Sequence, residues 1–346
     1  MSTVLAMRDR NMFIGTGQCG GNIAREFDKL GYQAYYINSN LADLRTLGVS
    51  SDKTFHIPSA EGCNKDVQKA KEYAKLYYDQ IIEILNTKYS QFKNKFFCFS
   101  LGGGTGGGIS PVLIQAIATA NPDANVGAIV ALPDESDSVK AKENALRCLQ
   151  SLSSLLDIGT LKNVYLLDNS AGDILEINAD IAERLTRLFN VTKPNIRGIV
   201  DTSEIENLLS ISGCVNIFDI IEGESNLTLS QDKFLTKSGE GCQKILYSLK
   251  DDAHLIQSEL EEITGKPIDY FKGYCEDSEN SIAFSFGMQM PKAKLATFER
   301  NYKEELESSR TEGKFGLNFD LGSPQPIEEV KEEKPDNASV LASLFN

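Results

Sequence analysis

Residues 100–108 read Ser-Leu-Gly-Gly-Gly-Thr-Gly-Gly-Gly, and this stretch decides the fold that the sequence predicts. An apolar strand is predicted just before it at 96–100, and a helix after it at about 109–120. Glycines between a strand and a helix let the backbone approach a phosphate, whose charge the helix N-terminus favours. A flexible linker is the alternative, and the closely flanking apolar segments argue against it. The stretch therefore predicts a phosphate-binding loop.

Apolar strands alternate with helices over the first half of the chain. We predict strands at 12–18, 32–37, 96–100, 126–132 and 163–168. From apolar residues at helical spacing we predict a helix after the first strand and further helices at 67–85, 109–120, 138–156 and 173–191. Strands that are apolar throughout indicate a parallel sheet covered on both faces. The predicted fold class is therefore α/β, a Rossmann-type parallel sheet followed by a long central helix.

The pattern changes after the long helix. Strands are predicted at 215–221 and 281–288 with helices between them, and a further helix at 291–313. From Gly322 the composition shifts to Pro, Glu, Lys and Ser, which is typical of disorder. We therefore predict a nucleotide-binding domain (1–172), a central helix (173–192), a second, smaller α/β domain (193–290), a C-terminal helix and extension (291–321) and an acidic tail (322–346).

The composition argues against several classes of protein. The net charge of −14 repels bare nucleic acid over most of the surface, so direct DNA binding is not expected. No apolar run reaches the roughly 18 residues that indicate a membrane span, and the first residues lack the apolar stretch of a signal peptide. The seven cysteines are scattered, without a CxxC pair. Reduced thiols in a cytoplasm fit this pattern better than disulfides or a zinc site.

A second glycine-rich stretch, Gly-Thr-Gly-Gln-Cys-Gly-Gly-Asn at 15–22, lies between the first predicted strand and its helix. It matches the GxGxxG pattern, which alone also fits a dinucleotide-dependent Rossmann oxidoreductase. Such an enzyme usually has an acid at the end of its second strand to hold the ribose, and this chain has Asn38-Ser39-Asn40 there. The oxidoreductase is therefore the distant alternative.

Both glycine stretches follow strands of the predicted parallel sheet, so both can face one crevice at the carboxyl ends of the strands. Two anion-binding loops facing one ligand suit a nucleoside triphosphate better than a single pyrophosphate. Neither loop is followed by Lys-Ser or Lys-Thr, so this is not a Walker P-loop. The phosphate charge is expected to be met by backbone N–H groups, helix dipoles and Mg²⁺ held through phosphates and water, with no protein ligand assigned.

The two stretches together resemble the nucleotide loops of the tubulin/FtsZ superfamily, strongly over 12–210 and vaguely beyond. The resemblance implies GTP or GDP as the ligand, GTPase activity and head-to-tail self-assembly. The GTP-binding residues that it implies are Gly17, Gln18, Cys19, Gly20, Gly21 and Asn22 in the first loop, Asn38 in the second, Gly62 in the third (62–64), Gly103, Gly104, Thr105, Gly106 and Gly107 in the signature loop, Asp137 and Lys140 at the ribose with Glu135 as the alternate, and Asn169 and Asn178 at the guanine.

The resemblance also implies that the catalytic group comes from the next subunit, in a loop after the long helix. Asp201 and Glu204 match the family's paired acids there. Such carboxylates would position water and metal rather than form a covalent intermediate. Asp201 or Ser203 also fits the N-cap of a helix predicted at 204–211, and both interpretations can hold together. Head-to-tail stacking that buries GTP against a neighbour's acids would couple hydrolysis to filament growth.

Within the superfamily the chain most resembles the TubZ group, GTPases that segregate plasmid or phage DNA. The tubulin-like first loop, the long helix at 291–313 and the acidic tail carry this resemblance. It implies a DNA-binding adaptor of the TubR type, with the tail after Gly322 as a candidate contact. A divergent FtsZ acting in cell division is the alternative, which genetic context would distinguish. The expected partners are therefore further copies of the chain and an adaptor, with neither nucleic acid nor membrane bound directly.

Overall fold

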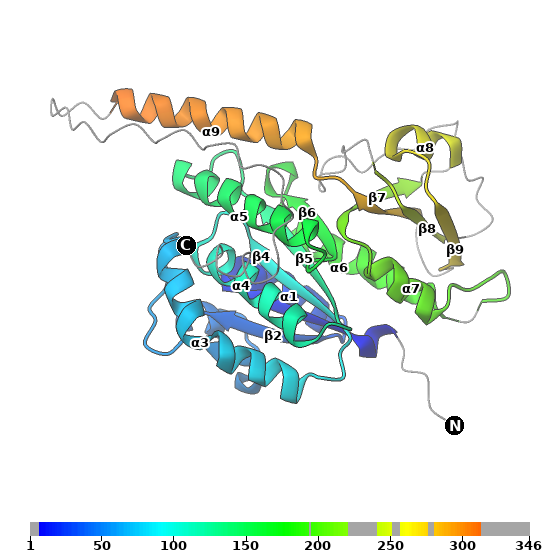
Figure 1. The fold of residues 1–346 in the computed structure, drawn as a ribbon, viewed down its shortest axis with the longest axis horizontal. Helices are drawn as coiled ribbons and strands as arrows, with labels where there is room; N and C mark the ends of the chain where they lie inside the picture. The colour runs from blue at the N-terminus through cyan, green and yellow to red at the C-terminus, as the bar shows by residue number, and fades with distance from the viewer. Residues whose placement is uncertain (1–6, 194, 221–240, 251–256, 276–279, 313–346) are drawn as a thin grey trace.

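The computed structural model describes residues 7–193, 195–220, 241–250, 257–275 and 280–312. Its centre is a ten-stranded sheet in the order β3-β2-β1-β4-β5-β6-β7-β10-β8-β9 (Figure 1). The strands of the first half pair in parallel, which confirms the predicted α/β class. These strands are β1 (Asn11–Thr16), β2 (Gln33–Asn38), β3 (Thr54–His56), β4 (Asn94–Ser100), β5 (Asn125–Leu132) and β6 (Asn163–Asp168).

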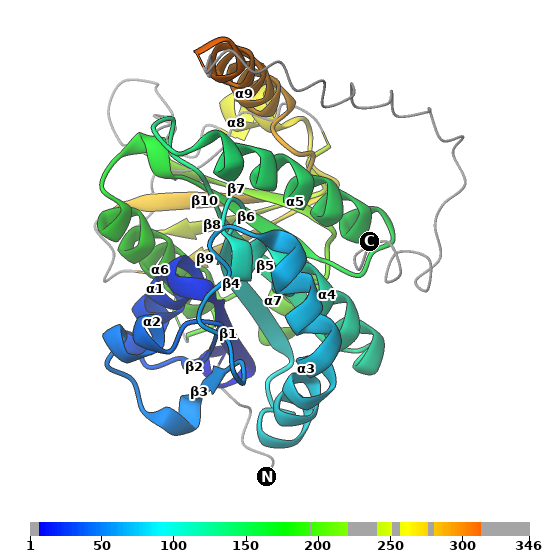
Figure 2. The same ribbon diagram turned by 90° about the vertical axis from the view of Figure 1, so that its left-hand side faces the viewer.

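Helices cover both faces of the parallel strands, as Figure 2 shows. In β4, Phe97 and Phe99 pack into the core on one face, and Phe96 and Cys98 into the core on the other, because successive side chains of a strand alternate between faces. One layer holds α1 (Gly17–Lys29), α2 (Leu41–Thr46), α6 (Ile174–Asn190) and α7 (Thr202–Leu209), and the other holds α3 (Val67–Lys88), α4 (Gly104–Ala120) and α5 (Val139–Asp157). Short 3-10 helices are η1 (Met7–Arg10), η2 (Ser51–Lys53) and η3 (Asn169–Ala171).

Helix α4 begins at Gly104, well before its predicted start at residue 109. Glycine in a helix interior costs roughly 0.5–1 kcal/mol relative to alanine, which is why the composition indicated a loop. Tertiary packing overrides this preference. A Cβ on Gly106 would lie 2.9 Å from Phe99 Cβ, and one on Gly108 would lie 2.5 Å from Ala70 Cβ. The glycines therefore let α4 lie closely against β4 and α3.

The second half of the chain continues the same sheet. β7 (Gly213–Ile220) pairs in parallel with β6 over two residue pairs, Asn163 with Gly213 and Val164 with Cys214. β10 (Ser281–Met288) lies antiparallel between β7 and β8 (Lys244–Leu249), and β9 (Asp269–Tyr274) pairs in parallel with β8. One sheet spans both halves of the chain, so the sheet itself marks no boundary between domains. The predicted division into domains therefore stays a prediction.

Helices are expected between β7 and β10, whereas the described part there contains β8 and β9 as well as α8 (Gln257–Thr264). The side chains of Ile245, Leu246, Tyr247 and Leu249 in β8 are all buried. A short apolar run fits a strand buried on both faces, but it also fits a segment of a buried helix. The sequence of β8 therefore did not decide between strand and helix.

Helix α9 (Lys292–Glu312) confirms the helix predicted at 291–313 and lies beside α5 (Figure 1). Two ion pairs tie it to the first half of the chain: Lys142 to Glu305 at 2.5 Å and Lys294 to Asp168 at 2.6 Å. The predicted extension from 313 and the acidic tail from Gly322 lie outside the described residues. Among the helices that the structure describes, none combines the length and apolar character needed to cross a membrane.

Candidate functional site

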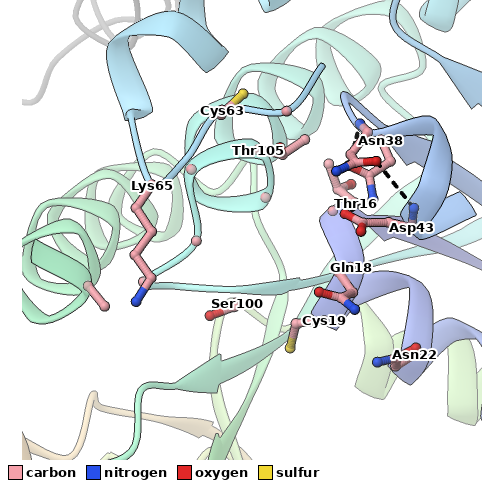
Figure 3. Close-up of a pocket in the computed structure, with 18 of the residues that line it drawn as sticks. Thr16, Gln18, Cys19, Asn22, Asn38, Asp43, Cys63, Lys65, Ser100 and Thr105 are labelled. Atoms are coloured by element: carbon pink, nitrogen blue, oxygen red, sulfur yellow. Dashed lines mark hydrogen bonds between the residues drawn. The ribbon is translucent and has the colours of Figure 1, made fainter. Parts of the chain in front are cut away.

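A cavity of about 580 Å³ opens at the carboxyl edge of the parallel strands (Figure 3). Segments that follow β1, β2, β4, β5 and β6 line it, which is where ligands of open α/β sheets lie. Its volume falls in the range of about 300–1,000 Å³ typical of small-molecule pockets. The predicted residues that line it are Gly17, Gln18, Cys19, Asn22, Asn38, Gly62, Gly103, Gly104, Thr105, Gly106, Asp137, Asn169 and Asn178. The fold thus brings both glycine stretches and both asparagines to one site.

Helices α1 and α4 begin at this cavity without a side-chain cap. Their N-cap residues are Thr16 and Gly103, and neither makes a side-chain capping hydrogen bond. By contrast, side chains cap the N-termini of α2, α3, α5, α6 and α7. The first N–H groups of a helix have no partner within the helix and favour an anion. Two such helix ends at one cavity suit a ligand with several phosphates.

Three predicted glycines do not line the cavity. A Cβ on Gly20 would lie 1.9 Å from the carbonyl oxygen of Cys98 in β4, and one on Gly21 or Gly107 would come within 3.0 Å of a neighbouring atom. Helix α1 starts at Gly17, inside the span predicted as strand, with a φ of 73° that suits glycine. Close packing of α1 and α4 accounts for these glycines, and their contact with a nucleotide stays a prediction.

Three loops meet beside the start of α4. The Ser39 hydroxyl lies 2.6 Å from the Thr105 hydroxyl, and the Cys63 thiol donates to the Ser39 hydroxyl at 3.4 Å. The Gly62 N–H donates to the Ser39 carbonyl oxygen at 2.8 Å. These bonds hold the second and third loops against the signature stretch. These three segments, which are far apart in the sequence, therefore form one wall of the cavity.

Two asparagines line the cavity with oxygens that have no partner. Asn178 of α6 is 2% exposed, and its Oδ1 has no hydrogen bond from any described residue. Asn169 Oδ1 in η3 is also buried without a partner in the described part of the chain. The Asp168 carboxylate sets the turn that carries Asn169, because it accepts from the Ser170 N–H at 3.1 Å and from the Ser170 hydroxyl at 2.5 Å. Buried polar atoms are normally hydrogen-bonded, so these oxygens indicate a ligand with N–H or O–H donors.

The cysteine of the first loop is a neutral thiol at neutral pH. Burial, together with the nearby Asp137 carboxylate, raises the pKa of Cys19 to about 12. The thiolate is the reactive form of cysteine, so Cys19 is a poor nucleophile here. Its side chain therefore forms part of the cavity wall rather than a reactive group.

The residues predicted to contact the ribose do not all lie at the cavity. Asp137 lines the cavity, and its carboxylate accepts from the Asp134 N–H at 3.2 Å. Lys140 does not line it, and its ammonium group pairs with Glu143 one turn along α5 at 3.2 Å. The alternate residue, Glu135, lines a neighbouring cavity beneath α9 instead. Of these residues, only Asp137 is placed by the fold where a ligand in the main cavity would meet it.

Asp201 and Glu204 lie away from this cavity, at the start of α7, which begins at Thr202 rather than at the predicted residue 204. They form a capping box: Asp201 Oδ1 accepts from the Glu204 N–H at 2.8 Å, and Glu204 Oε2 accepts from the Asp201 N–H at 2.8 Å. Hydrogen bonds from the Ser203 hydroxyl and the Glu204 N–H lower the pKa of Asp201. The predicted capping role of Asp201 is thus confirmed.

Helix α7 packs at the amino edge of the sheet. Its Glu206 forms ion pairs with Lys93, which precedes β4, at 2.7 Å, and with Arg10, which precedes β1. Asn125 at the start of β5 donates to the Glu206 carbonyl oxygen at 3.4 Å. Helix α6 joins the two edges, since it begins at the cavity with Ile174 and runs antiparallel to the strands. The acids and the cavity therefore lie at opposite edges of one molecule.

Several residues that line the cavity lie outside the predicted set. Asp43 of α2 accepts a hydrogen bond from the Asn38 carboxamide at 3.2 Å, and Lys65 follows the third loop. Most of the others are next to a predicted residue in the sequence. Their position near the end of a strand could therefore have predicted that they line the cavity. They are Thr16, Ser39, Asn40, Cys63, Asn64, Ser100, Gly102, Pro133, Ala141 and Ile174.

Comparison with known proteins agrees with this geometry. Residues 11–171 match the model of the Tubulin/FtsZ family, GTPase domain. The tubulin-like protein TubZ of Clostridium botulinum C phage is 28% identical over 348 residues, 97% of this chain and 93% of the relative. A solved structure of Clostridium botulinum phage c-st TubZ, truncated at its C-terminal tail, matches with a TM-score of 0.78 and 27% identity over 87% of this chain and 99% of that one.

A further solved structure shares the fold. It is a GTPγS-form protofilament of TubZ from Bacillus thuringiensis serovar israelensis, with a TM-score of 0.71 and 18% identity over 89% of this chain and 95% of that one. The residues matched to the family model run from β1 to η3 and contain both uncapped helix N-termini. These matches favour a GTPase over the oxidoreductase alternative. The chain therefore contains a GTPase domain of the Tubulin/FtsZ family at residues 11–171.

Proposed function

We propose that the chain binds GTP in the cavity and assembles head-to-tail into filaments in which GTP is hydrolysed. The observation that carries the proposal is the pair of uncapped helix N-termini, of α1 and α4, opening on one cavity. Their N–H groups would bind the phosphates. The unpartnered oxygens of Asn169 and Asn178 would accept hydrogen bonds from the guanine edge. Ile174, 45% exposed beside them, offers an apolar surface to the base.

Hydrolysis in this proposal needs a second copy. Stacking the carboxyl edge of one copy on the amino edge of the next would bring Asp201 and Glu204 to the bound GTP. Such a heterologous contact does not close on itself and generates a filament. The two carboxylates would orient the attacking water and accept its proton.

The cavity also suits Mg²⁺ bound with the nucleotide. Magnesium takes oxygen ligands and commonly keeps phosphates among them. The hydroxyls of Ser39 and Thr105 and the carboxylate of Asp43 line the cavity and are donors of this kind. When bound, the ion would neutralise phosphate charge in the transition state.

Assembly and turnover test the proposal together. Light scattering and electron microscopy of the full chain with GTP and Mg²⁺ should show filaments, and phosphate release per molecule should rise with protein concentration. In a single copy Asp201 and Glu204 do not line the cavity, so turnover at low concentration should be slow. Turnover that is independent of concentration would contradict catalysis between subunits, and failure to bind GTP would contradict the whole proposal.

We further propose that the filament moves or segregates plasmid or phage DNA through an adaptor of the TubR type. The similarity to a phage TubZ extends over nearly the whole chain, and a net charge of −14 disfavours direct DNA binding. The test is co-sedimentation of GTP-grown filaments with a DNA-binding protein encoded beside this chain's gene and its DNA site. DNA that sediments without that protein would contradict the adaptor, and a gene lying in a chromosomal division cluster would favour the FtsZ-type alternative.

A further inference from the structure

Lys65 lines the cavity, although neither glycine stretch is followed by the lysine of a Walker P-loop. Of the described residues that line the cavity, Lys65 alone has a cationic side chain, and Asp43 and Asp137 have anionic ones. A triphosphate brings several more negative charges. Helix N-termini contribute only partial positive charge. Lys65 is therefore the one full positive charge that the described lining residues can offer to a triphosphate.

The backbone places Lys65 in an unusual conformation. Asn64 and Lys65 have φ values of 47° and 59°, in the left-handed region that non-glycine residues seldom adopt. The loop lies against the first residue of α4, because a Cβ on Gly104 would be 3.1 Å from Lys65 Cα. Figure 3 shows the Lys65 side chain extending from this loop into the space between the lining residues. Such backbone conformations persist where the surrounding structure enforces them.

Asn144 of α5 holds the backbone of Lys65 in this conformation. Its side chain is 2% exposed, and its Nδ2 donates to the Lys65 carbonyl oxygen at 2.8 Å and to the Gly102 carbonyl oxygen at 3.2 Å. One buried carboxamide therefore connects the third loop to the signature loop. Neither family resemblance nor sequence pattern assigned it a role.

The ammonium group of Lys65 has only weak partners in the structure. It lies 3.4 Å from Asp137 Oδ1 and 3.1 Å from the Ser138 hydroxyl. The Lys65 and Asp137 side chains are 43% and 37% exposed, and an exposed ion pair of this kind contributes little to stability. A phosphate oxygen would form a stronger, charge-assisted hydrogen bond. Lys65 can therefore exchange Asp137 for a phosphate at little cost.

We propose that Lys65 contacts the terminal phosphate of the bound triphosphate and that Asn144 is the residue that positions it. The inference rests on the proposed GTP site. When the terminal phosphate leaves, Lys65 returns to Asp137 and Ser138, so this side chain distinguishes GTP from GDP.

Equilibrium binding of GTPγS and of GDP to the full chain with Mg²⁺ tests the inference. Lys65→Met should weaken GTPγS binding about tenfold, as expected for a lost charge-assisted hydrogen bond, and GDP binding less than about twofold. Lys65→Arg should restore most of the difference. The matched control is Lys69→Met, which removes the same charge from an exposed site one turn away that does not line the cavity.

Asn144→Ala should cause the same selective loss of GTPγS binding, and combining it with Lys65→Met should add nothing further, because both act through one contact. Equal weakening of GTPγS and GDP, or no weakening of either, by Lys65→Met would overturn the inference while leaving the GTP site intact. An unaltered chain that binds neither nucleotide would overturn the proposed function and the inference with it.

Discussion

The two edges of the sheet both hold residues with expected roles in GTP chemistry, and they differ in how far those residues are satisfied. At the carboxyl edge, buried oxygens of Asn169 and Asn178 lack partners, and two helices begin uncapped. At the amino edge, Asp201 and Glu204 satisfy each other in a capping box. Unsatisfied buried groups point to a ligand, whereas folding alone explains a satisfied pair. Nucleotide binding can thus be argued from one molecule, and hydrolysis only from contact between two.

Removing the carboxylate of Glu204 is expected to have the largest effect. Glu204→Ala should lower GTP turnover under assembly conditions by about 100-fold or more, the range for a positioned acid or base. GTP binding should be unchanged, because Glu204 lies at the opposite edge from the cavity. Phosphate release and equilibrium binding measure the two quantities.

Glu204→Gln separates catalysis from capping. Glutamine at this position of a capping box still accepts from the N-cap N–H, so α7 keeps its start. Alanine loses that bond and should destabilise the chain by about 1 kcal/mol in a denaturant titration. If the glutamine variant hydrolyses GTP at the normal rate, the carboxylate has only a structural role and the contrast between the edges disappears.

Gly20→Ala should cause the next largest effect. Its Cβ would lie 1.9 Å from the Cys98 carbonyl oxygen, and overpacking against backbone costs about 3 kcal/mol. The matched variant is Gly103→Ala, whose Cβ would make ordinary contacts at 3.7 Å. Denaturant unfolding should separate the two. Equal stabilities would mean that the glycines of α1 are not packing residues.

Asn178 tests whether an unpartnered buried oxygen binds the base. Asn178→Leu keeps a similar volume but removes the acceptor, and the preference for GTP over ATP should fall about tenfold. Asn178→Asp keeps an oxygen acceptor and should retain most of that preference. Competition binding with the two nucleotides is the measurement. A leucine variant that still discriminates would remove Asn178 from the base contact.

The smallest effect is expected from Lys294→Ala on α9. The ion pair with Asp168 steadies the turn that carries Asn169, but the Lys294 side chain is 38% exposed, so the pair contributes about 0–1 kcal/mol. GTP affinity should fall about twofold, and raised salt should remove the difference from the unaltered chain. A salt-independent loss would indicate that α9 acts through packing.

Much of the site could be predicted because its residues follow strands. Gln18, Asn38 and Asn169 come at or directly after the carboxyl ends of strands, and topology brings those ends to one edge. Lys65 could not be found in this way. Its loop has no periodicity, and its conformation depends on Asn144, which is distant in sequence.

The amino-acid sequence by itself determined the alternation of strands and helices and the two glycine stretches, because these depend on local periodicity and on the size of single residues. Only the tertiary structure decided where the signature stretch becomes helix, since packing against Phe99 and Ala70 overrides the helix preference of glycine. The tertiary structure also placed Asp201 and Glu204 at the far edge from the cavity. Which groups a chain satisfies internally, and which it leaves for a ligand or a neighbour, depends on contacts between residues far apart in sequence.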